Sequence, residues 1–252
     1  MATRDRAPTA LPIATAITLL AALLRFLYLG HDSLWFDEVL TRGTAVASLA
    51  SPAAALAMRD HVPLLYWLTA LVLRVLPEHE VTLRLVSALA GVLAVPLLLA
   101  LGRAARLPAA GRWAALLLAV SPFHIRYSQE ARHYALLLFF SLLALYWLYR
   151  ATAAGACGDR RAGRIWLAFA AATVANLLTH YSAWLWLVGQ GVAVALWLAW
   201  RARQGDGRAA RPVLPAMFVI GVALVLLLGR AAEALRANTD GAAGTTSAAA
   251  LS

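Results

Sequence analysis

The chain is dominated by apolar runs of the length that a helix needs to cross a membrane. A bilayer core takes roughly 17 to 25 mostly apolar helical residues, and six runs approach that length, while a seventh, 113–123, is shorter but bounded by Arg112 and by Ser121-Pro122. The runs are Leu11–Leu29, Leu83–Leu101, Trp113–Phe123, Ala135–Tyr149, Ile165–Thr179, Ala183–Trp200 and Val213–Gly229. With 62% hydrophobic and 13% charged residues and a mean hydropathy of +0.73, the chain has more apolar surface than one soluble core of this length hides. The sequence therefore predicts an all-α, polytopic transmembrane helix bundle with about seven spans.

The net charge of +10 comes entirely from arginine, because the chain contains no lysine. The arginines lie in short clusters between apolar runs, a pattern typical of topological anchors, so we expect no nucleic-acid partner. The single cysteine, Cys157, excludes an internal disulfide. The first apolar run is longer than a signal-peptide core and precedes no small-residue cleavage site, so we expect it to remain as an anchor.

The distribution of arginine assigns the connections to two sides of a membrane. Pro63–Leu76 is only 14 residues long and carries Arg74; if it spanned, the charge bias of every later connection would be reversed, so we predict that it lies in the interface. The inner segments then hold thirteen arginines and three acids, and the outer segments hold eight arginines and nine acids. Arg25 lies inside the first span, close enough to its outer end to snorkel. This predicts a multi-pass protein of the cell membrane with a cytoplasmic N-terminus.

The predicted chemistry lies on the outer face, where the first outer loop, about 30–82, contains one or two helices along the membrane surface. The transmembrane module is expected to cover 1–236. Residues 237–252, rich in Ala, Gly, Thr and Ser, are expected to form a flexible tail or to mark a truncation point.

Adjacent carboxylates, Asp37 and Glu38, follow the first span directly. They come after Trp35-Phe36, which suits the interface, and before an apolar-rich stretch, 39–49, that can lie down as an amphipathic helix. A helix start would place both acids where backbone N–H groups favour negative charge. They would be available as a general base or as metal ligands, and solvation in an outer loop is the plain alternative.

Other polar residues cluster at the predicted outer ends of the spans. His61 opens the interfacial segment, and Tyr66 belongs to its polar stripe, although a surface role for His61 is an alternative. Arg84 stands at the outer end of the second span, where snorkelling alone would explain it. The segment 121–134 is the densest polar cluster between two apolar runs; a solvated connection with an Arg126–Glu130 pair at helical spacing is its alternative. The candidates from that segment and from the connection between the fifth and sixth spans are Tyr127, Glu130, Arg132, Tyr134 and His180.

In order along the chain, these segments resemble the bacterial GT-C glycosyltransferases, which include protein O-mannosyltransferases and the aminoarabinose transferases of lipid A. The resemblance runs from about Leu24 to Trp200. It rests on a Trp-x-Asp-Glu element at 35–38, an Arg-x-x-Ser-Ala-Leu element at 84–89, and Ser-Pro-Phe followed by Tyr-Ser-Gln-Glu-Ala-Arg-x-Tyr within 121–134. At 61–64 the chain has His-Val-Pro-Leu where the family has His-Pro-Pro-Leu.

The resemblance implies transfer of a sugar, with inversion, from a polyprenyl-phosphate-linked donor to a protein, lipid or glycan acceptor on the outer face. It implies that Asp37 is the general base and that Glu38 assists it or holds a metal, a divalent cation being the one cofactor left open. The implied substrate contacts are His61, Tyr66, Arg84, Tyr127, Glu130, Arg132, Tyr134 and His180. Arg84 and Arg132 are expected to converge with Asp37 on the donor phosphate; a structural role, paired with Glu80 or Glu130, is the alternative.

Two other functions stay open at this point. Family members continue through further spans, so a truncated, inactive membrane module or scaffold is the first alternative. A transporter would show charges or Gly/Pro breaks near the middle of several spans, often in repeated halves. The chain offers little beyond Asn176 and Gln190 there, which favours the transferase.

Overall fold

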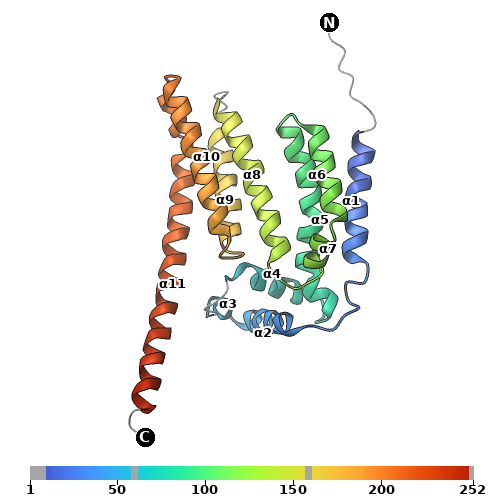
Figure 1. Ribbon diagram of the computed structural model, residues 1–252, viewed down its shortest axis with the longest axis vertical. Coiled ribbons are helices and arrows are strands. Elements are labelled where there is room, and N and C mark those ends of the chain that lie inside the picture. Colours follow the sequence, from blue (N-terminus) through green and yellow to red (C-terminus); the bar gives the residue numbers. More distant parts are fainter. Residues whose placement is uncertain (1–9, 58–61, 157–160, 250–252) are drawn as a thin grey trace.

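The computed structural model describes residues 10–57, 62–156 and 161–249. Within these ranges the protein consists of helices and connections, without a strand, so the all-α prediction is confirmed. Figure 1 shows a set of roughly upright helices and a layer of helices across one end. The upright helices are α1 (Ala10–Phe26), α5 (Glu80–Ala104), α6 (Pro108–Val120), α8 (Tyr134–Ala156), α9 (Ala162–Leu177), α10 (Ala183–Arg203) and α11 (Leu214–Ala249). At the layered end lie α2 (Phe36–Ala50), α3 (Ala53–Ala57), α4 (Leu64–Leu73) and α7 (Pro122–Ser128), while the 3₁₀ helix η1 (Gly207–Ala210) joins α10 to α11.

Each predicted apolar run falls on one upright helix. Four segments are long and apolar enough to cross a membrane: Glu80–Ala104, Tyr134–Gly155, Ala183–Arg203 and Gly207–Arg230. The helices at Leu11–Phe26, Pro108–Val120 and Ala162–Leu177 are apolar but shorter. The protein is therefore a helical membrane protein.

The third predicted run differs from the observed helix at both ends. It was expected at 113–123, whereas α6 begins at Pro108 and ends at Val120. Proline has no N–H for a continuing helix and is favoured at a helix start, and the Ser121 hydroxyl accepts a hydrogen bond from the His124 backbone N–H at 3.4 Å. Ser121-Pro122 thus ends one helix and begins the next, which adds α7 at the layered end.

The one or two helices expected in the first outer loop correspond to α2 and α4. Both lie across the upright helices in Figure 1, and they contact each other. Asp37 and Glu38 lie in the first turn of α2, as predicted. The short, apolar α4 contributes Leu65 to a buried cluster with α5 and α8, so one of its faces packs on the bundle.

The upright helices are joined by three buried clusters. One connects α1, α5 and α6, a second connects α4, α5 and α8, and a third connects α8 to α9, α10 and α11 around Trp166 and Phe169. The α5–α6 crossing is so close that a Cβ on Gly102 would lie 2.5 Å from the Cα of Gly111. Only glycine fits there, as at the close helix crossings common in membranes.

Arg25 does not snorkel, so that expectation is wrong. It is fully buried, and its guanidinium donates to the carbonyls of Ala21, Leu118 and Ala119 at 2.9 to 3.1 Å. Its Nη2 also lies 2.7 Å from Nδ1 of His124. The break after α6 leaves backbone carbonyls at its end without helical hydrogen-bond partners. The guanidinium of Arg25 donates to these carbonyls inside the bundle and therefore does not extend to water.

The last upright helix extends into the end of the chain. Residues 237–249, which belong to the stretch predicted to be a flexible tail or a truncation point, continue α11 to Ala249. Alanine has the highest intrinsic helix propensity, and this stretch is rich in it.

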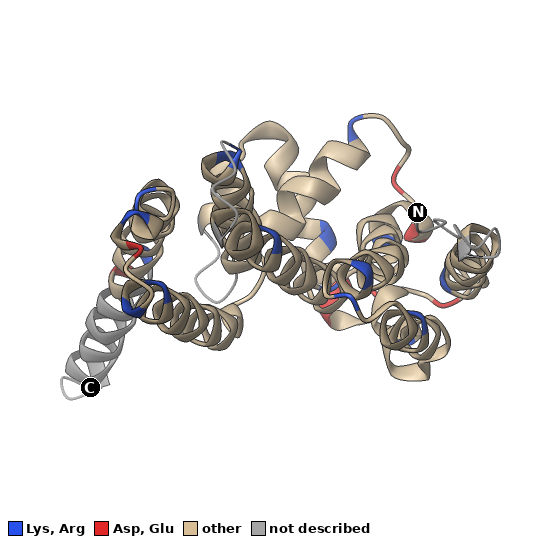
Figure 2. Ribbon diagram, turned by 90° about the horizontal axis from the view of Figure 1, so that it is seen from above, with Lys and Arg blue, Asp and Glu red and all other residues tan. Residues whose placement is uncertain are grey.

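The connections lie at two opposite ends of the bundle. Figure 1 shows the α5–α6 and α10–α11 connections, the end of α8 and the start of α9 at one end, and α2, α3, α4 and α7 at the other. Figure 2 looks onto the first end and shows arginine at several helix ends there. The segments predicted as inner and outer are thus separated in space; which end faces the cytoplasm stays a prediction.

We predict that the end with α2 and α4 faces outward, because the arginine-rich connections favour the cytoplasm. In a Cys157→Ser background, Ser51→Cys should react with an impermeant thiol reagent on intact cells. Leu107→Cys, 61% exposed at the α5–α6 connection, should react only after permeabilisation. The reverse labelling pattern would overturn the orientation.

We also predict that acid destabilises the α6–α7 junction. Burial, and to a smaller extent the neighbouring Arg25, lower the pKa of His124 to about 4 from its ordinary 6.5. Between pH 4 and pH 6.5 the unfolded chain therefore binds more protons at this histidine than the folded protein does. The stability that is present above pH 6.5 is lost as the pH falls toward 4, by at most about 3 kcal/mol. Thermal unfolding at pH 7.5 and pH 4.5 should show a smaller pH effect in His124→Asn than in the unaltered protein. An equal pH effect in both would contradict the assignment.

Candidate functional site

A fully buried ion pair lies under the layered end of the bundle. Glu38 is 0% exposed, and its Oε2 lies 2.8 Å from Nη2 of Arg84, whose side chain is 5% exposed. Oε1 accepts from Arg84 Nε at 2.9 Å and from the Ala131 backbone N–H at 2.7 Å. The Trp35 backbone N–H donates to Oε2 at 3.4 Å. Glu38 is thus satisfied on both oxygens, as a buried carboxylate requires.

Arg84 uses all five of its N–H groups on the protein itself. Besides the two bonds to Glu38, Nη1 donates to the carbonyls of Leu29 and Asp32 at 2.9 Å, and Nη2 donates to that of Ser33 at 3.4 Å. No donor remains for a phosphate. The geometry therefore favours the structural alternative for Arg84, with Glu38 as its partner in place of the two acids considered from the sequence.

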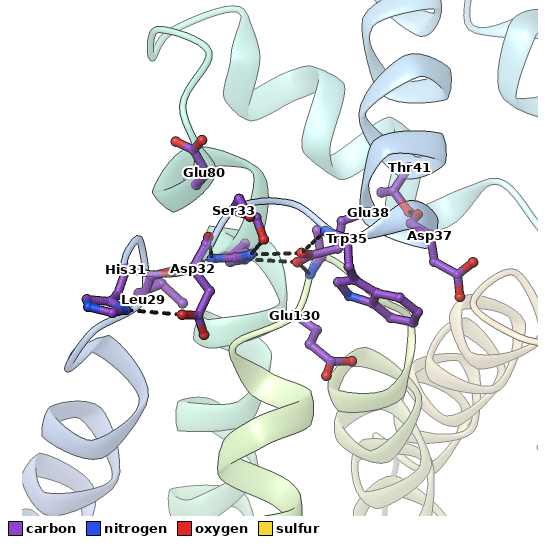
Figure 3. A network of polar contacts seen from close by, with 12 residues as sticks. Leu29, His31, Asp32, Ser33, Trp35, Asp37, Glu38, Thr41, Glu80 and Glu130 are labelled. Atoms are coloured by element: carbon purple, nitrogen blue, oxygen red, sulfur yellow. Dashed lines mark hydrogen bonds and ion pairs between the residues drawn. The ribbon is translucent and has the colours of Figure 1, made fainter.

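Asp37 is the open member of the acidic pair. Figure 3 shows its side chain pointing away from the Glu38 network. Its Oδ2 lies 3.2 Å from Nη2 of Arg132, and the two side chains are 30% and 12% exposed. The Arg132 guanidinium also lies over the rings of Trp35 and Tyr134, 5.9 and 5.8 Å from their centroids. Aromatic faces hold a guanidinium in place while leaving its edge available to anions.

A row of aromatic side chains continues from Asp37 and Arg132. The ring of Tyr66, on α4, lies 5.5 Å from that of His133, and His133 lies 6.0 Å from His180 in the α9–α10 connection. Burial raises the pKa of Tyr66 to about 12, with Arg132 opposing and Asp37 adding to the shift. The phenol is therefore protonated at neutral pH and can donate a hydrogen bond.

On the other side of Trp35 the structure has a cavity of about 860 Å³. Tyr127, Glu130 and Tyr134 line it. The Glu130 carboxylate is 15% exposed and lies 3.2 Å from Nε of Arg126, so the pair expected at this helical spacing is present. Cavities of this size with a few placed polar groups are typical of small-molecule sites.

The structure does not present Asp37 and Glu38 as two ligands of one metal ion. Their side chains diverge, and Glu38 is occupied by Arg84 and backbone amides. Among the residues that the structure describes, no three His, Cys, Asp or Glu side chains are grouped to hold a metal. Asp37 is the carboxylate of this pair with an open edge for a cation.

The predicted site residues divide into three groups. Asp37, Tyr66, Arg132, Tyr134 and His180 come from distant segments and gather at one end of the bundle. Glu38 and Arg84 form the buried support, and Tyr127 and Glu130 line the cavity. His61 lies outside the described residues.

Two further residues of this region, His133 and Trp35, were not among the predicted site residues. His133 is 2% exposed and lies between Tyr66 and His180. His133 occupies the unspecified position of the Arg-x-Tyr element, so the motif gave no reason to select it. Its place in the dense polar cluster 121–134 is the signal that could have identified it. Trp35 was taken as an interface anchor, but its ring lines the cavity and lies between the carboxylates of Asp37 and Glu130 in Figure 3.

The family model described as dolichyl-phosphate-mannose-protein mannosyltransferase matches residues 60–229. The chain belongs to this family. The mannosyltransferase family is one of membrane glycosyltransferases, in agreement with the resemblance found from the motifs. The matched region contains Tyr66, Arg84, Arg132 and His180, whereas Asp37 precedes it and joins the site through its contact with Arg132. A comparison with curated proteins found no match.

We predict that Glu38→Gln strongly destabilises the fold, because it leaves the buried Arg84 charge without a counter-charge. Breaking a buried pair costs about 3 to 5 kcal/mol. Glu78→Gln is the matched control, since Glu78 pairs with Arg42 at the surface, where both side chains are more than a third exposed, and such pairs contribute about 1 kcal/mol or less. Thermal unfolding of the purified variants measures the difference, and equal losses would contradict the supporting role of Glu38.

Proposed function

We propose that the protein transfers a sugar from a polyprenyl-phosphate-linked donor to an acceptor hydroxyl at the outer face of the cell membrane. The family supports sugar transfer in a membrane. The observation that carries the proposal is the Asp37–Arg132 pair: a partly exposed carboxylate beside a guanidinium, held at one end of the bundle by a buried network. A lipid-linked donor reaches such a position laterally, with its phosphate near the membrane surface.

Asp37 is the general base of the proposed reaction. It takes the proton of the acceptor hydroxyl while the hydroxyl oxygen forms a bond to the anomeric carbon. The bond between that carbon and the phosphate oxygen breaks, and polyprenyl phosphate leaves with the electron pair. Attack from the face opposite the phosphate inverts the configuration at the anomeric carbon.

Arg132 is the proposed ligand of the donor phosphate. Its Nε is buried and has no hydrogen-bond partner among the described residues, while Nη2 contacts Asp37. A phosphate accepts the planar fork of a guanidinium through two oxygens. The protonated phenol of Tyr66 lies in the same electrostatic neighbourhood and is a second donor for charge on the leaving group. If a divalent cation takes part, Asp37 is the residue proposed to hold it.

Replacement of the base tests the proposal directly. Asp37→Asn keeps the shape of the side chain but cannot accept the proton, so transfer should fall by about 10²- to 10⁴-fold. Transfer is followed with polyprenyl phosphate carrying radiolabelled mannose, the sugar in the family name, and membrane extract as acceptor. Glu80→Gln, which alters another carboxylate at the same end of the bundle, should leave transfer unchanged. Near-normal transfer by Asp37→Asn would remove Asp37 from the base role, and absence of transfer by the unaltered protein would favour the inactive-module alternative.

Arg132→Lys tests the phosphate ligand. Lysine keeps the charge but loses the fork, so the affinity for polyprenyl phosphate should fall by about tenfold or more, equivalent to about 1.4 kcal/mol. Arg42→Lys, at a surface pair on α2, is the control and should bind like the unaltered protein. Equal affinities for all three proteins, measured by calorimetry in detergent micelles, would assign Arg132 a structural role.

A further inference from the structure

The cavity on the far side of Trp35 is not used by the proposed base or by the proposed phosphate ligand. It lies between the α1–α2 connection and the segment from α7 to the start of α8, and its volume is about 860 Å³. Asp32 and Trp35 line it from the first segment, and Arg126, Tyr127, Glu130 and Tyr134 line it from the second. It has room for a ligand with at least one sugar ring.

The charge of the cavity wall disfavours a phosphate. Two of its acids are neutralised, since Glu38 pairs with Arg84 and Glu130 pairs with Arg126. Asp32 adds a third carboxylate, whose side chain is 89% exposed and contacts only the ring of neighbouring His31 at 3.1 Å among the described side chains. The three carboxylates and the two guanidinium groups of the lining leave one excess negative charge, so the wall favours an uncharged or cationic ligand.

The aromatic lining fits the apolar faces of a sugar ring. Tyr127 and Tyr134 both line the cavity, and their ring centroids lie 4.6 Å apart, so the two rings form a row. Trp35 is 47% exposed. Aromatic rings offer broad apolar contact at little cost in side-chain entropy. The Glu130 carboxylate and the Arg126 guanidinium, which also line the cavity, supply acceptors and donors for hydroxyl groups.

Two aromatic side chains, Trp35 and Tyr134, connect the cavity to the proposed base. Trp35 and Tyr134 line the cavity, and both also carry the Arg132 guanidinium that pairs with Asp37. In Figure 3 the indole of Trp35 lies between the carboxylates of Asp37 and Glu130. A ligand that reaches past the edge of these rings would bring one hydroxyl to Asp37.

We propose that this cavity is the acceptor subsite and that it binds an uncharged or amino sugar of the acceptor. The proposal rests on the proposed function, because it takes Asp37 as the base that receives the acceptor proton. The donor phosphate and the acceptor sugar then occupy opposite sides of Trp35. Their separation follows from charge: a free guanidinium edge on one side and excess carboxylate on the other.

The test measures glycoside binding without donor and without transfer. The full chain in nanodiscs is titrated with methyl α-glucoside, methyl α-mannoside and methyl glucosaminide. Saturation-transfer NMR should show binding of at least one of these three glycosides. Glu130→Gln and Tyr127→Ala should each weaken that binding by about tenfold, the loss expected for one buried polar or aromatic contact. Glu78→Gln and Tyr146→Ala, which remove the same residue types elsewhere, are the matched controls and should bind normally.

Several outcomes would overturn the proposal. One is that none of the three glycosides binds, and a second is that both cavity variants bind the glycoside as tightly as the unaltered protein. A third is that mannose 1-phosphate or a serine-rich peptide displaces the bound glycoside at a lower concentration than the same unlabelled glycoside does. Asp37→Asn should still bind the glycoside. Normal transfer by Asp37→Asn together with glycoside loss in the cavity variants would refute the assigned base and leave the sugar subsite standing.

Discussion

The buried pair between Glu38 and Arg84 is the interaction on which the described site depends. Two charges removed from water are tolerated only when each has a counter-charge and its remaining hydrogen bonds are made. Here that requirement recruits backbone groups from three segments: the turn after α1, the residue that precedes α2, and the loop before α8. The pair therefore fixes the start of α2, which carries Asp37, against the loop that carries Arg132.

Neighbouring acids in one helical turn acquire different chemistry from their directions alone. Successive side chains on a helix point about 100° apart, so when Glu38 enters the buried network, Asp37 must face elsewhere. It faces Arg132, where it stays partly exposed. Arg132 is held over Trp35 and Tyr134, and these rings divide the end of the bundle into a side rich in donors and a side with excess carboxylate. Such a division suits an anionic leaving group and an uncharged acceptor.

Much of the site was predictable as a set of segments, but the pairing of its residues was not. Hydropathy and motif order located the start of α2, the start of α5 and the loop before α8. They left the partner of Arg84 open and offered Glu80 and Glu130 instead of Glu38, because all three acids lie on the same predicted face and only packing distinguishes them. The prediction for Arg25 was wrong for a related reason. A charged residue near the end of a span is usually solvated, whereas the carbonyl groups that Arg25 contacts at the end of α6 reach it only through tertiary packing.

The sequence by itself determined that the chain is a helical membrane protein, where its apolar helices lie, and which segments share an end of the bundle. Those properties follow from local hydrophobicity and from alternation along the chain, which need no knowledge of contacts. Tertiary structure decided which carboxylate is buried and which is open, how α7 arises at Ser121-Pro122, and that Trp35 lines a cavity and lies between the carboxylates of Asp37 and Glu130. These depend on side-chain directions and on the burial of charge, which are set only when distant segments pack together.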